Sequence, residues 1–141
     1  MNSIEIISGG AENLDKIEFL WEKLKEHHHD LSEHFKERFY RMTWQTRKEN
    51  LMKKCAGDKM LVEYAVHSSD NRIVGYCISG IDREDEKCGE IESLYVEEEF
   101  RKNGLGYRFM QRAMNWLDKY DVEKQKILVA AGNDNALGFY R

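Results

Sequence analysis

The sequence predicts one α/β (α+β) domain with a mixed, mostly antiparallel central sheet flanked by helices. Strand-like apolar segments alternate with segments of helical periodicity, which predicts both kinds of element. The 141 residues match the commonest size of a single domain, and a composition that is 41% hydrophobic can fill one core. No apolar run approaches the roughly 18 residues of a membrane span, so no membrane partner is expected.

Charge and cysteine content limit the partners and the cellular compartment that are expected for this domain. Lys and Arg number 22 against 26 Asp and Glu, a net charge of −4, whereas a nucleic-acid-binding surface usually carries a basic surplus. Cys55, Cys77 and Cys88 are widely spaced and form no CxxC pair, so neither a disulfide framework nor a zinc knuckle is predicted. We expect a cytoplasmic protein without a nucleic-acid partner.

The first half of the chain is predicted to form one strand followed by three helices. Residues 3–7 are a short apolar strand that ends at a Gly-Gly pair, and apolar side chains from 14 to 24 recur at helical spacing. The segment 30–33, Asp-Leu-Ser-Glu, is typical of the start of a second helix. Thr46 begins a capping-box pattern, which predicts a third helix that stops at Gly57.

The second half is predicted to form a hairpin, a third long strand, a long helix and a last strand. A Ser-Ser-Asp-Asn turn joins the two apolar segments of the hairpin, because these residues favour tight turns. A charged loop follows, and apolar residues then recur at helical spacing from Leu105 onward. The strands are expected at 60–66, 73–81, 90–96 and 126–130, and the helix at 105–120.

A glycine-bearing turn joins the 90–96 strand to the long helix, with the sequence Arg-Lys-Asn-Gly-Leu-Gly from Arg101 to Gly106. The first turn of a helix carries unpaired N–H groups and a partial positive charge, which suit a phosphate, and glycine lets the ligand approach closely. Arg101 and Lys102 would add cationic donors. By itself the pattern fits a tight connection as well as a phosphate cradle, and it is neither a Walker loop nor a dinucleotide fingerprint.

The segment from Leu94 to Gly106 resembles the signature of the GNAT superfamily of N-acetyltransferases, Arg/Gln-x-x-Gly-x-Gly/Ala. A strand ending in Leu-Tyr-Val precedes the glycines, as in many members, and the residues from Asn133 to Arg141 resemble the second cofactor motif of the family. The order of elements agrees from residue 3 to the end of the chain. The resemblance implies a GNAT-like sheet that splays between the 90–96 and 126–130 strands.

The resemblance implies acetyl-CoA as cosubstrate and direct transfer of its acetyl group to an amine of a small molecule or a peptide. The pyrophosphate would lie on the amides of 101–106. The pantetheine arm would run along the end of the preceding strand, where main-chain groups freed by the splay can pair with it. One freed amide would serve as an oxyanion hole. The implied cofactor-binding residues are Leu94, Tyr95, Val96, Arg101, Lys102, Asn103, Gly104, Leu105, Gly106 and Asn133.

Three residues are candidates for catalysis. Tyr140 matches the family's tyrosine that protonates the departing thiolate, and a phenol with a pKa of about 10 is a protonated donor at neutral pH. The alternative for Tyr140 is a packed aromatic side chain. Glu90 and Glu92 share one strand face by alternation, and Glu90 matches the base of some histone-acetylating members. A solvent-facing acidic strand, with proton removal through ordered water, is the alternative for this pair.

A histidine cluster and an acidic run have less specific interpretations. His27, Asp30 and His34 share a helix face, yet consecutive histidines at a helix end are more often solvated than metal-bound, so no metal site is predicted. In the resembled family this region walls the acceptor pocket, which makes residues 27–35 the candidate for acceptor recognition. The glutamates at 97–99 are interpreted as a solvated turn.

Two questions stay open at the level of sequence. A non-catalytic acyl-CoA-binding or regulatory module with the same fold is the alternative to an enzyme. If the protein is an enzyme, its net negative charge favours a cationic acceptor through electrostatic steering. The family fold normally continues past Tyr140 into two more strands, so we expect a single domain over 1–141 that is truncated at its C-terminus. The alternative is a homodimer in which a second copy covers the exposed edge of the 126–130 strand.

Overall fold

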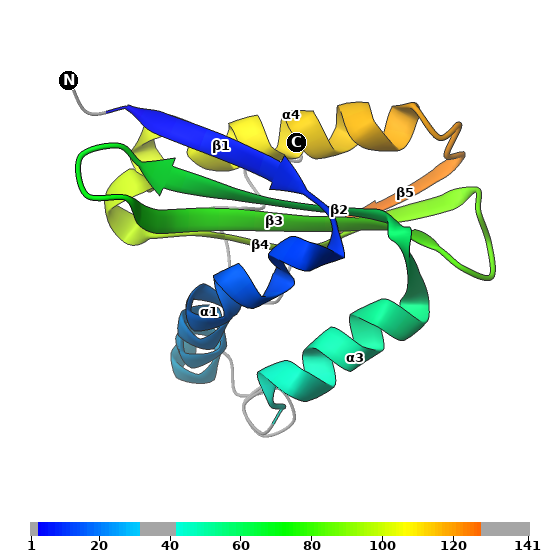
Figure 1. Cartoon of the computed structure of the whole chain (residues 1–141), viewed down its shortest axis with the longest axis horizontal. Helices are drawn as coiled ribbons and strands as arrows, with labels where there is room; N and C mark the ends of the chain where they lie inside the picture. Colours follow the sequence, from blue (N-terminus) through cyan, green and yellow to red (C-terminus); the bar gives the residue numbers. More distant parts are fainter. Residues whose placement is uncertain (1–2, 32–41, 128–141) are drawn as a thin grey trace.

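The computed structural model describes residues 3–31 and 42–127 of the chain, and the strands and helices in these ranges follow the predicted order (Figure 1). In chain order the elements are β1 (Ile4–Gly9), η1 (Ala11–Ile17), α1 (Glu18–Leu31), α3 (Trp44–Lys54), β2 (Cys55–His67), β3 (Arg72–Asp82), β4 (Cys88–Val96), η2 (Glu98–Asn103), α4 (Leu105–Asp118) and β5 (Lys124–Ile127). The second helix expected from residue 30 onward lies largely outside the described residues. Within the two described ranges, no helix is long and apolar enough to cross a membrane.

The five strands form one sheet in the order β1-β2-β3-β4-β5. Neighbouring strands run antiparallel except β4 and β5, which are parallel, so the prediction of a mixed, mostly antiparallel sheet is confirmed. β2 and β3 form the expected hairpin. Both strands are longer than the sequence indicates, because pairing continues to His67 and Arg72 beside the turn.

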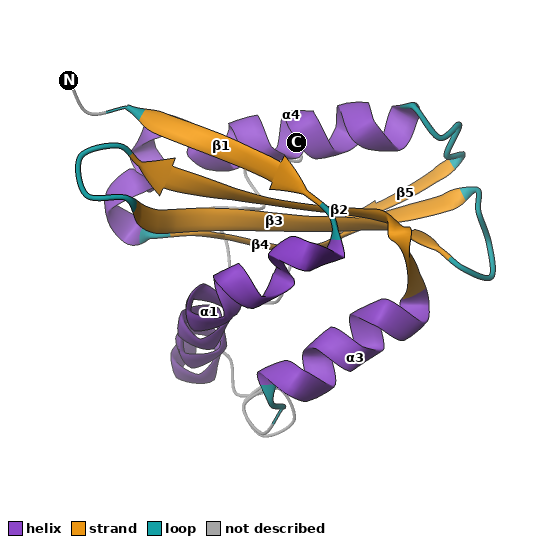
Figure 2. Ribbon diagram, viewed as in Figure 1, coloured by secondary structure: helices purple, strands orange, loops and turns teal. Residues whose placement is uncertain are grey.

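Helices cover both faces of the sheet (Figure 2). Side chains along a strand point alternately to the two faces of the sheet, so both faces carry apolar residues. α1 and α3 pack on one face and α4 packs on the other. The core on the α1 and α3 face includes Trp21, Trp44 and Tyr76, whereas the core on the α4 face includes Phe109 and Leu117. The sheet therefore lies between two apolar cores, which is why every residue of β4 is buried.

Helix α3 begins and ends at other residues than the sequence predicts. It starts at Trp44, and the hydroxyl of Thr43 caps it by accepting the Thr46 N–H at 3.1 Å. The prediction that Thr46 opens this helix was wrong, because the capping side chain lies three residues earlier. The predicted stop at Gly57 was wrong as well, since the chain already enters β2 at Cys55.

A β-bulge interrupts the pairing of β3 with β4. Ile78 lies opposite Ser93 and Ser79 lies opposite Ile91, so Glu92 has no partner on β3. A bulge leaves one residue of the longer strand outside the ladder of hydrogen bonds. The main chain at Glu92 therefore needs another hydrogen-bond partner, and it finds one in α3.

β4 and β5 are paired at their first residues. Cys88 lies opposite Lys124 and Ile91 lies opposite Ile127. The last strand was expected at 126–130, so it begins two residues earlier than the sequence indicates. The predicted splay falls beyond Ile127, outside the described residues, and within them no strand pairs with β4 from 92 to 96 on the β5 side.

Candidate functional site

The turn between β4 and α4 has the geometry of an anion site. Gly104 stands at the N-cap position of α4 with a φ of +75°, in the left-handed region that glycine favours. A Cβ built at Gly104 would meet no heavy atom within 4 Å, so the space in front of this residue is open. None of the described side chains caps α4 through a hydrogen bond. The N–H groups of the first turn of α4 can therefore face a phosphate oxygen.

Arg101 closes this turn against the end of β4. Its Nε donates to the Val96 carbonyl oxygen at 2.8 Å, and its guanidinium lies 5.6 Å from the centre of the Tyr95 ring. Lys102 and Asn103 are exposed between this anchor and the glycine. The turn is thus tied to β4 by Arg101 and presents a cation and an amide side chain to solvent.

Glu90 and Glu92 lie on the α3 side of β4 and share one lysine. The Nζ atom of Lys54, the last residue of α3, lies 2.9 Å from an oxygen of each carboxylate. The side chains of Glu90 and Glu92 are 11% and 1% exposed. The two glutamates share a face, as predicted, but the alternative of a solvent-facing acidic strand was wrong because both carboxylates are buried under α3.

Arg47 of α3 is the second cation beside these glutamates. Its Nη2 donates to the main-chain carbonyl oxygen of Glu92 at 3.1 Å and lies 3.8 Å from the Glu92 carboxylate. The bulge residue thereby recovers a hydrogen bond for its backbone. Next to it, the Tyr76 hydroxyl and the Ser93 Oγ are hydrogen-bonded at 2.8 Å, so polar groups continue along the buried side of the bulge.

Burial and the neighbouring charges shift the pKa of Glu92 in opposite directions. Burial, the largest cause, raises the pKa of Glu92, and the charge of Glu90 adds to it, whereas Lys54 and Arg47 lower the pKa. Glu92 Oε2 lies 2.9 Å from Lys54 Nζ, but the direction of approach is not that of a hydrogen bond, so this buried oxygen has no well-directed donor among the described atoms. Burial would lower the pKa of Lys54, but the two glutamates outweigh it and raise that pKa.

The other predicted site residues are only partly within the described chain. Leu94 and Val96 contribute to the core under α4 and Tyr95 to the opposite core, and all three are buried. Tyr140 and Asn133 lie outside the described residues, as does part of the 27–35 segment. In residues 3–31 and 42–127, no group of three His, Cys, Asp or Glu side chains could hold a metal ion.

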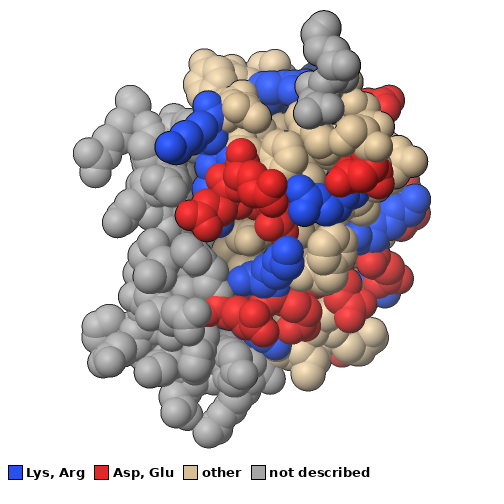
Figure 3. Space-filling model, turned by 90° about the vertical axis from the view of Figure 1, so that its left-hand side faces the viewer, with Lys and Arg blue, Asp and Glu red and all other residues tan. Residues whose placement is uncertain are grey.

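Of the glutamates after β4, Glu98 and Glu99 are exposed, as their interpretation as solvated residues predicts, whereas Glu97 is largely covered and ion-paired; the last two begin the 3-10 helix η2. The Nζ of Lys23 on α1 donates to Glu97 at 2.8 Å, and Arg72 on β3 lies 3.3 Å from Glu99. Figure 3 looks onto this end of the molecule and shows acidic and basic side chains interspersed. The Lys23–Glu97 pair joins α1 to the residue that directly follows β4.

Sequence reasoning missed Lys54 and Arg47. Their partners are 36 and 45 positions away in the chain, beyond the reach of any local spacing rule. The one signal for a cation at this site is the buried strand itself. Because Glu90 and Glu92 interrupt an otherwise apolar segment, their carboxylates need positive partners if the strand is covered on both faces.

The family of this chain is indicated by both sequence and structure comparison. The profile of the acetyltransferase (GNAT) family matches residues 21–141. An acetyltransferase of the GNAT family from Staphylococcus aureus has a similar structure, with a TM-score of 0.72 and 12% identity over 98% of this chain and 81% of that chain. An aminoglycoside acetyltransferase from an uncultured soil metagenomic sample, in complex with trehalose, has a TM-score of 0.62 and 21% identity over 98% and 85% of the two chains.

A third similar structure is a ribosomal-protein-alanine N-acetyltransferase from Brucella melitensis biovar Abortus. Its TM-score is 0.62 and its identity 12%, over 98% of this chain and 88% of that chain. No curated protein sequence matches the chain. At such identities the solved structures show the fold, and the family profile covers most of the sequence, including the Gly104 turn. The chain belongs to the GNAT family of acetyltransferases.

Proposed function

We propose that this protein is an acetyl-CoA-dependent N-acetyltransferase that moves an acetyl group directly from acetyl-CoA to an amine of a small molecule or a peptide. The observation that carries the proposal is the open turn at Gly104, where the uncapped start of α4 adjoins the end of β4. Membership of the GNAT family implies acyl transfer from acetyl-CoA. Transfer to nitrogen is the finer step that we propose.

The residues of the turn fit the pyrophosphate of acetyl-CoA. The amides of Leu105 and Gly106 follow the left-handed Gly104, in front of which the space is open. Lys102 is exposed and can add a charge-assisted hydrogen bond, and the exposed Asn103 can add a neutral one. When bound, acetyl-CoA supplies the activated acyl thioester.

The end of β4 is the proposed track of the pantetheine arm. The described residues place no strand beside the main chain of Leu94, Tyr95 and Val96 on the β5 side, so its free hydrogen-bonding groups can pair with the amides of a ligand. Arg101 holds this end of the strand through the Val96 carbonyl oxygen. Asn133, in the second motif, is proposed as a further cofactor contact.

Proton removal from the acceptor is assigned to Glu90. An acceptor ammonium must lose a proton before its nitrogen attacks the thioester carbonyl carbon. The Glu90 side chain is 11% exposed, whereas that of Glu92 is 1% exposed and is better placed to support Glu90 than to meet a substrate. Tyr140 is proposed to give its phenolic proton to the departing thiolate.

Small-molecule and peptide amines are both candidate acceptors. Two structural neighbours have names that specify aminoglycosides and an alanine of a ribosomal protein. The net charge of −4 favours a cationic acceptor, such as a polyamine or an aminoglycoside, through electrostatic steering. The segment 27–35 at the end of α1 is the proposed wall of the acceptor pocket, and the cytoplasm is the proposed compartment.

A non-catalytic acyl-CoA-binding module is the second candidate. The observation that favours it is the internal pairing of Glu90 and Glu92 with Lys54, because a carboxylate that already has a cation beside it is a weaker base. Such a module would bind acetyl-CoA without releasing CoA. It would share the Gly104 turn with the enzyme, so cofactor affinity alone does not separate the two candidates.

Release of free CoA thiol in the presence of a panel of amines tests the two candidates. The panel should contain polyamines, aminoglycosides and peptides with a free N-terminal amine. Thiol release that depends on one class of amine, with the acetylated amine as product, supports the N-acetyltransferase. Stabilisation by acetyl-CoA in a thermal shift experiment, without thiol release for any amine, would support the binding module instead.

A further inference from the structure

One lysine bridges the two buried glutamates of β4. Lys54 Nζ lies 2.9 Å from Glu90 Oε1 and 2.9 Å from Glu92 Oε2. The two carboxylates therefore approach each other within about 6 Å, the range in which like charges shift each other's ionisation. Lys54 reaches them from the end of α3, so the contact joins two elements that are far apart in the chain.

Two carboxylates this close do not both stay ionised in a buried site unless a cation accompanies them. Burial removes water from both charges, and each negative charge then raises the free energy of the other. The ammonium of Lys54 offsets this repulsion, because it attracts both carboxylates at hydrogen-bonding distance. Without that charge, one of the two carboxylates would keep its proton to a higher pH.

Arg47 does not substitute for Lys54 in this arrangement. Its Nη2 lies 3.8 Å from a Glu92 oxygen and is engaged by the main-chain carbonyl oxygen of the same residue. Among the described residues, the structure shows no ion pair between Arg47 and Glu90. Lys54 is thus the group that connects the more accessible carboxylate to the buried one.

Further ionisable groups lie near the pair on neighbouring elements. Arg47 of α3 and Cys55 of β2 interact with the glutamates, Tyr76 of β3 lies near Arg47, and Asp82 of β3 lies near Cys55. In the main-chain register of β5, Lys126 is opposite Glu90. Burial raises the pKa of the Cys55 thiol to about 11, so it is uncharged at neutral pH. Burial likewise raises the pKa of the Tyr76 phenol, which leaves Lys54 and Arg47 as the cations whose contacts with the pair the structure describes.

We infer that Lys54 is a positioning residue of the acetyl transfer, which keeps Glu90 and Glu92 ionised together so that Glu90 can accept the proton of the acceptor at neutral pH. The inference rests on the proposed function, because it takes Glu90 as the base. The Glu90 carboxylate receives a proton from the acceptor ammonium, and the freed nitrogen lone pair forms the C–N bond. The C–S bond breaks with its electron pair left on sulfur, which gains a proton from Tyr140, and the acceptor nitrogen loses its second proton to the Tyr140 phenolate, so that a neutral amide and free CoA thiol result. Lys54 stays protonated throughout.

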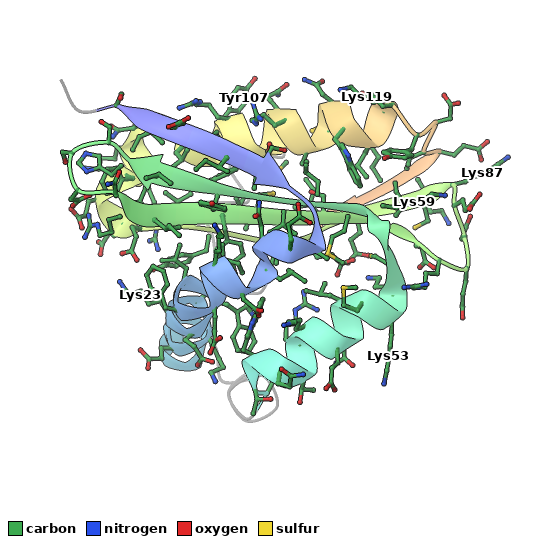
Figure 4. The ribbon with its side chains drawn as sticks, viewed as in Figure 1. Lys23, Lys53, Lys59, Lys87, Tyr107 and Lys119 are labelled. Atoms are coloured by element: carbon green, nitrogen blue, oxygen red, sulfur yellow. The ribbon has the colours of Figure 1, made fainter. Side chains whose placement is uncertain are left out.

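The pH profile of kcat/KM in variants of Lys54 tests this inference. Lys54→Met removes the charge and keeps an unbranched side chain, so the acid limb of the profile should move up by about 1 to 3 pH units. Lys54→Arg keeps the charge and should stay close to the wild type. Lys53→Met is the matched control, because Lys53 is an exposed neighbour whose side chain points away from the sheet (Figure 4). Its profile should equal that of the wild type.

A double variant distinguishes the effect of the Lys54 charge on the glutamates from the effect of its side-chain packing. In Lys54→Met combined with Glu92→Gln, the repulsion within the pair is gone, so the acid limb should return toward the wild type. A purely structural loss from Lys54→Met would persist in the double variant. An acid limb that Lys54→Met leaves in place, or that stays shifted in the double variant, would overturn the inference.

Carbon NMR titration of the glutamate carboxyl groups keeps this inference distinguishable from the proposed function. If no amine supports thiol release, the proposed function fails, and the titration alone decides the role of Lys54. A glutamate midpoint that moves up in Lys54→Met, but not in Lys54→Arg or Lys53→Met, supports the inference. Glutamate midpoints that are equal in all variants overturn it. Should Lys54→Met not fold, Lys54→Gln serves the same comparison.

Discussion

Arg112 on α4 and Glu63 on β2 form a bidentate ion pair on the α4 face of the sheet. Arg112 Nε lies 3.0 Å and Nη2 lies 2.7 Å from carboxylate oxygens of Glu63, which is 2% exposed. The pair holds α4 against the sheet about two helical turns beyond Gly104. The position of the start of α4, the proposed phosphate site, therefore depends on a contact outside the glycine turn.

Removal of the arginine from this pair should destabilise the protein. Arg112→Met leaves the buried Glu63 carboxylate without its cation, which typically costs about 3 kcal/mol. Urea unfolding at pH 7 measures the change. Arg108→Met, at an exposed position one turn earlier on α4, is the matched control and should stay within about 0.5 kcal/mol of the wild type.

Replacement of both partners separates the charge from the packing of this pair. Glu63→Leu combined with Arg112→Leu should recover most of the stability that Arg112→Met loses, since apolar pairs often replace buried ion pairs without loss. If the double variant were as unstable as Arg112→Met, the loss would come from the packing of the arginine side chain and not from the unpaired carboxylate.

Occupation of the space in front of Gly104 should abolish cofactor binding. Asparagine tolerates the left-handed conformation, and at Gly104→Asn the new side chain meets no neighbour within 4 Å of its Cβ, so the apo fold should persist. Gly104→Val adds backbone strain to the same obstruction. The thermal stabilisation by acetyl-CoA should disappear in both variants, and unchanged stabilisation in Gly104→Val would contradict the assignment of the turn.

Loss of the Tyr140 hydroxyl should slow turnover without weakening cofactor binding. Tyr140→Phe keeps the ring and removes the proton donor, so kcat should fall roughly 100-fold while the affinity for acetyl-CoA stays nearly constant. Steady-state kinetics together with a thermal shift measure both quantities. Tyr120→Phe, at an exposed tyrosine beyond the end of α4, is the control. Wild-type turnover in Tyr140→Phe would make this residue a packed aromatic side chain.

The raised pKa of Glu92 predicts how stability depends on pH. Burial raises this pKa above the ordinary value of 4.5, so the folded protein holds the proton to a higher pH than the unfolded chain. The stabilisation from Glu92 is therefore complete below pH 4.5 and is lost as the pH rises through the pKa of the folded state. Glu92→Gln is neutral at every pH, so it should raise the free energy of unfolding at pH 7 relative to the wild type.

Urea unfolding of Glu92→Gln at pH 7 and pH 4 checks this sign. The advantage of the variant should shrink at the lower pH, where Glu92 of the wild type is protonated. Glu84→Gln, an exposed glutamate of the loop before β4, should show no such pH-dependent difference. A Glu92→Gln protein that is less stable than the wild type at pH 7 would mean that the contacts with Lys54 and Arg47 outweigh the burial of the charge.

Local patterns predicted the elements better than their ends. The apolar segments at 60–66, 73–81 and 90–96 lie within β2, β3 and β4, because alternation along a strand is visible in a few residues. The start of α3 was misplaced, since Thr43 and Thr46 are both plausible caps and only the backbone conformation distinguishes them. The bulge at Glu92 has no sequence signature at all, because it depends on the register with β3.

Some features of the candidate site can be predicted from the sequence, and others depend on the folded chain. The order of the elements and the turn at Gly104 follow from the amino-acid sequence, because periodicity and the need for a left-handed residue are properties of adjacent positions. The contacts of Lys54 and Arg47 with the glutamates of β4 follow only from the folded chain. They depend on which side of α3 faces the sheet and on the shift that the bulge adds to β4. Charges separated by tens of residues in sequence interact only where packing removes water from between them, and here that packing sets the charge state of the site.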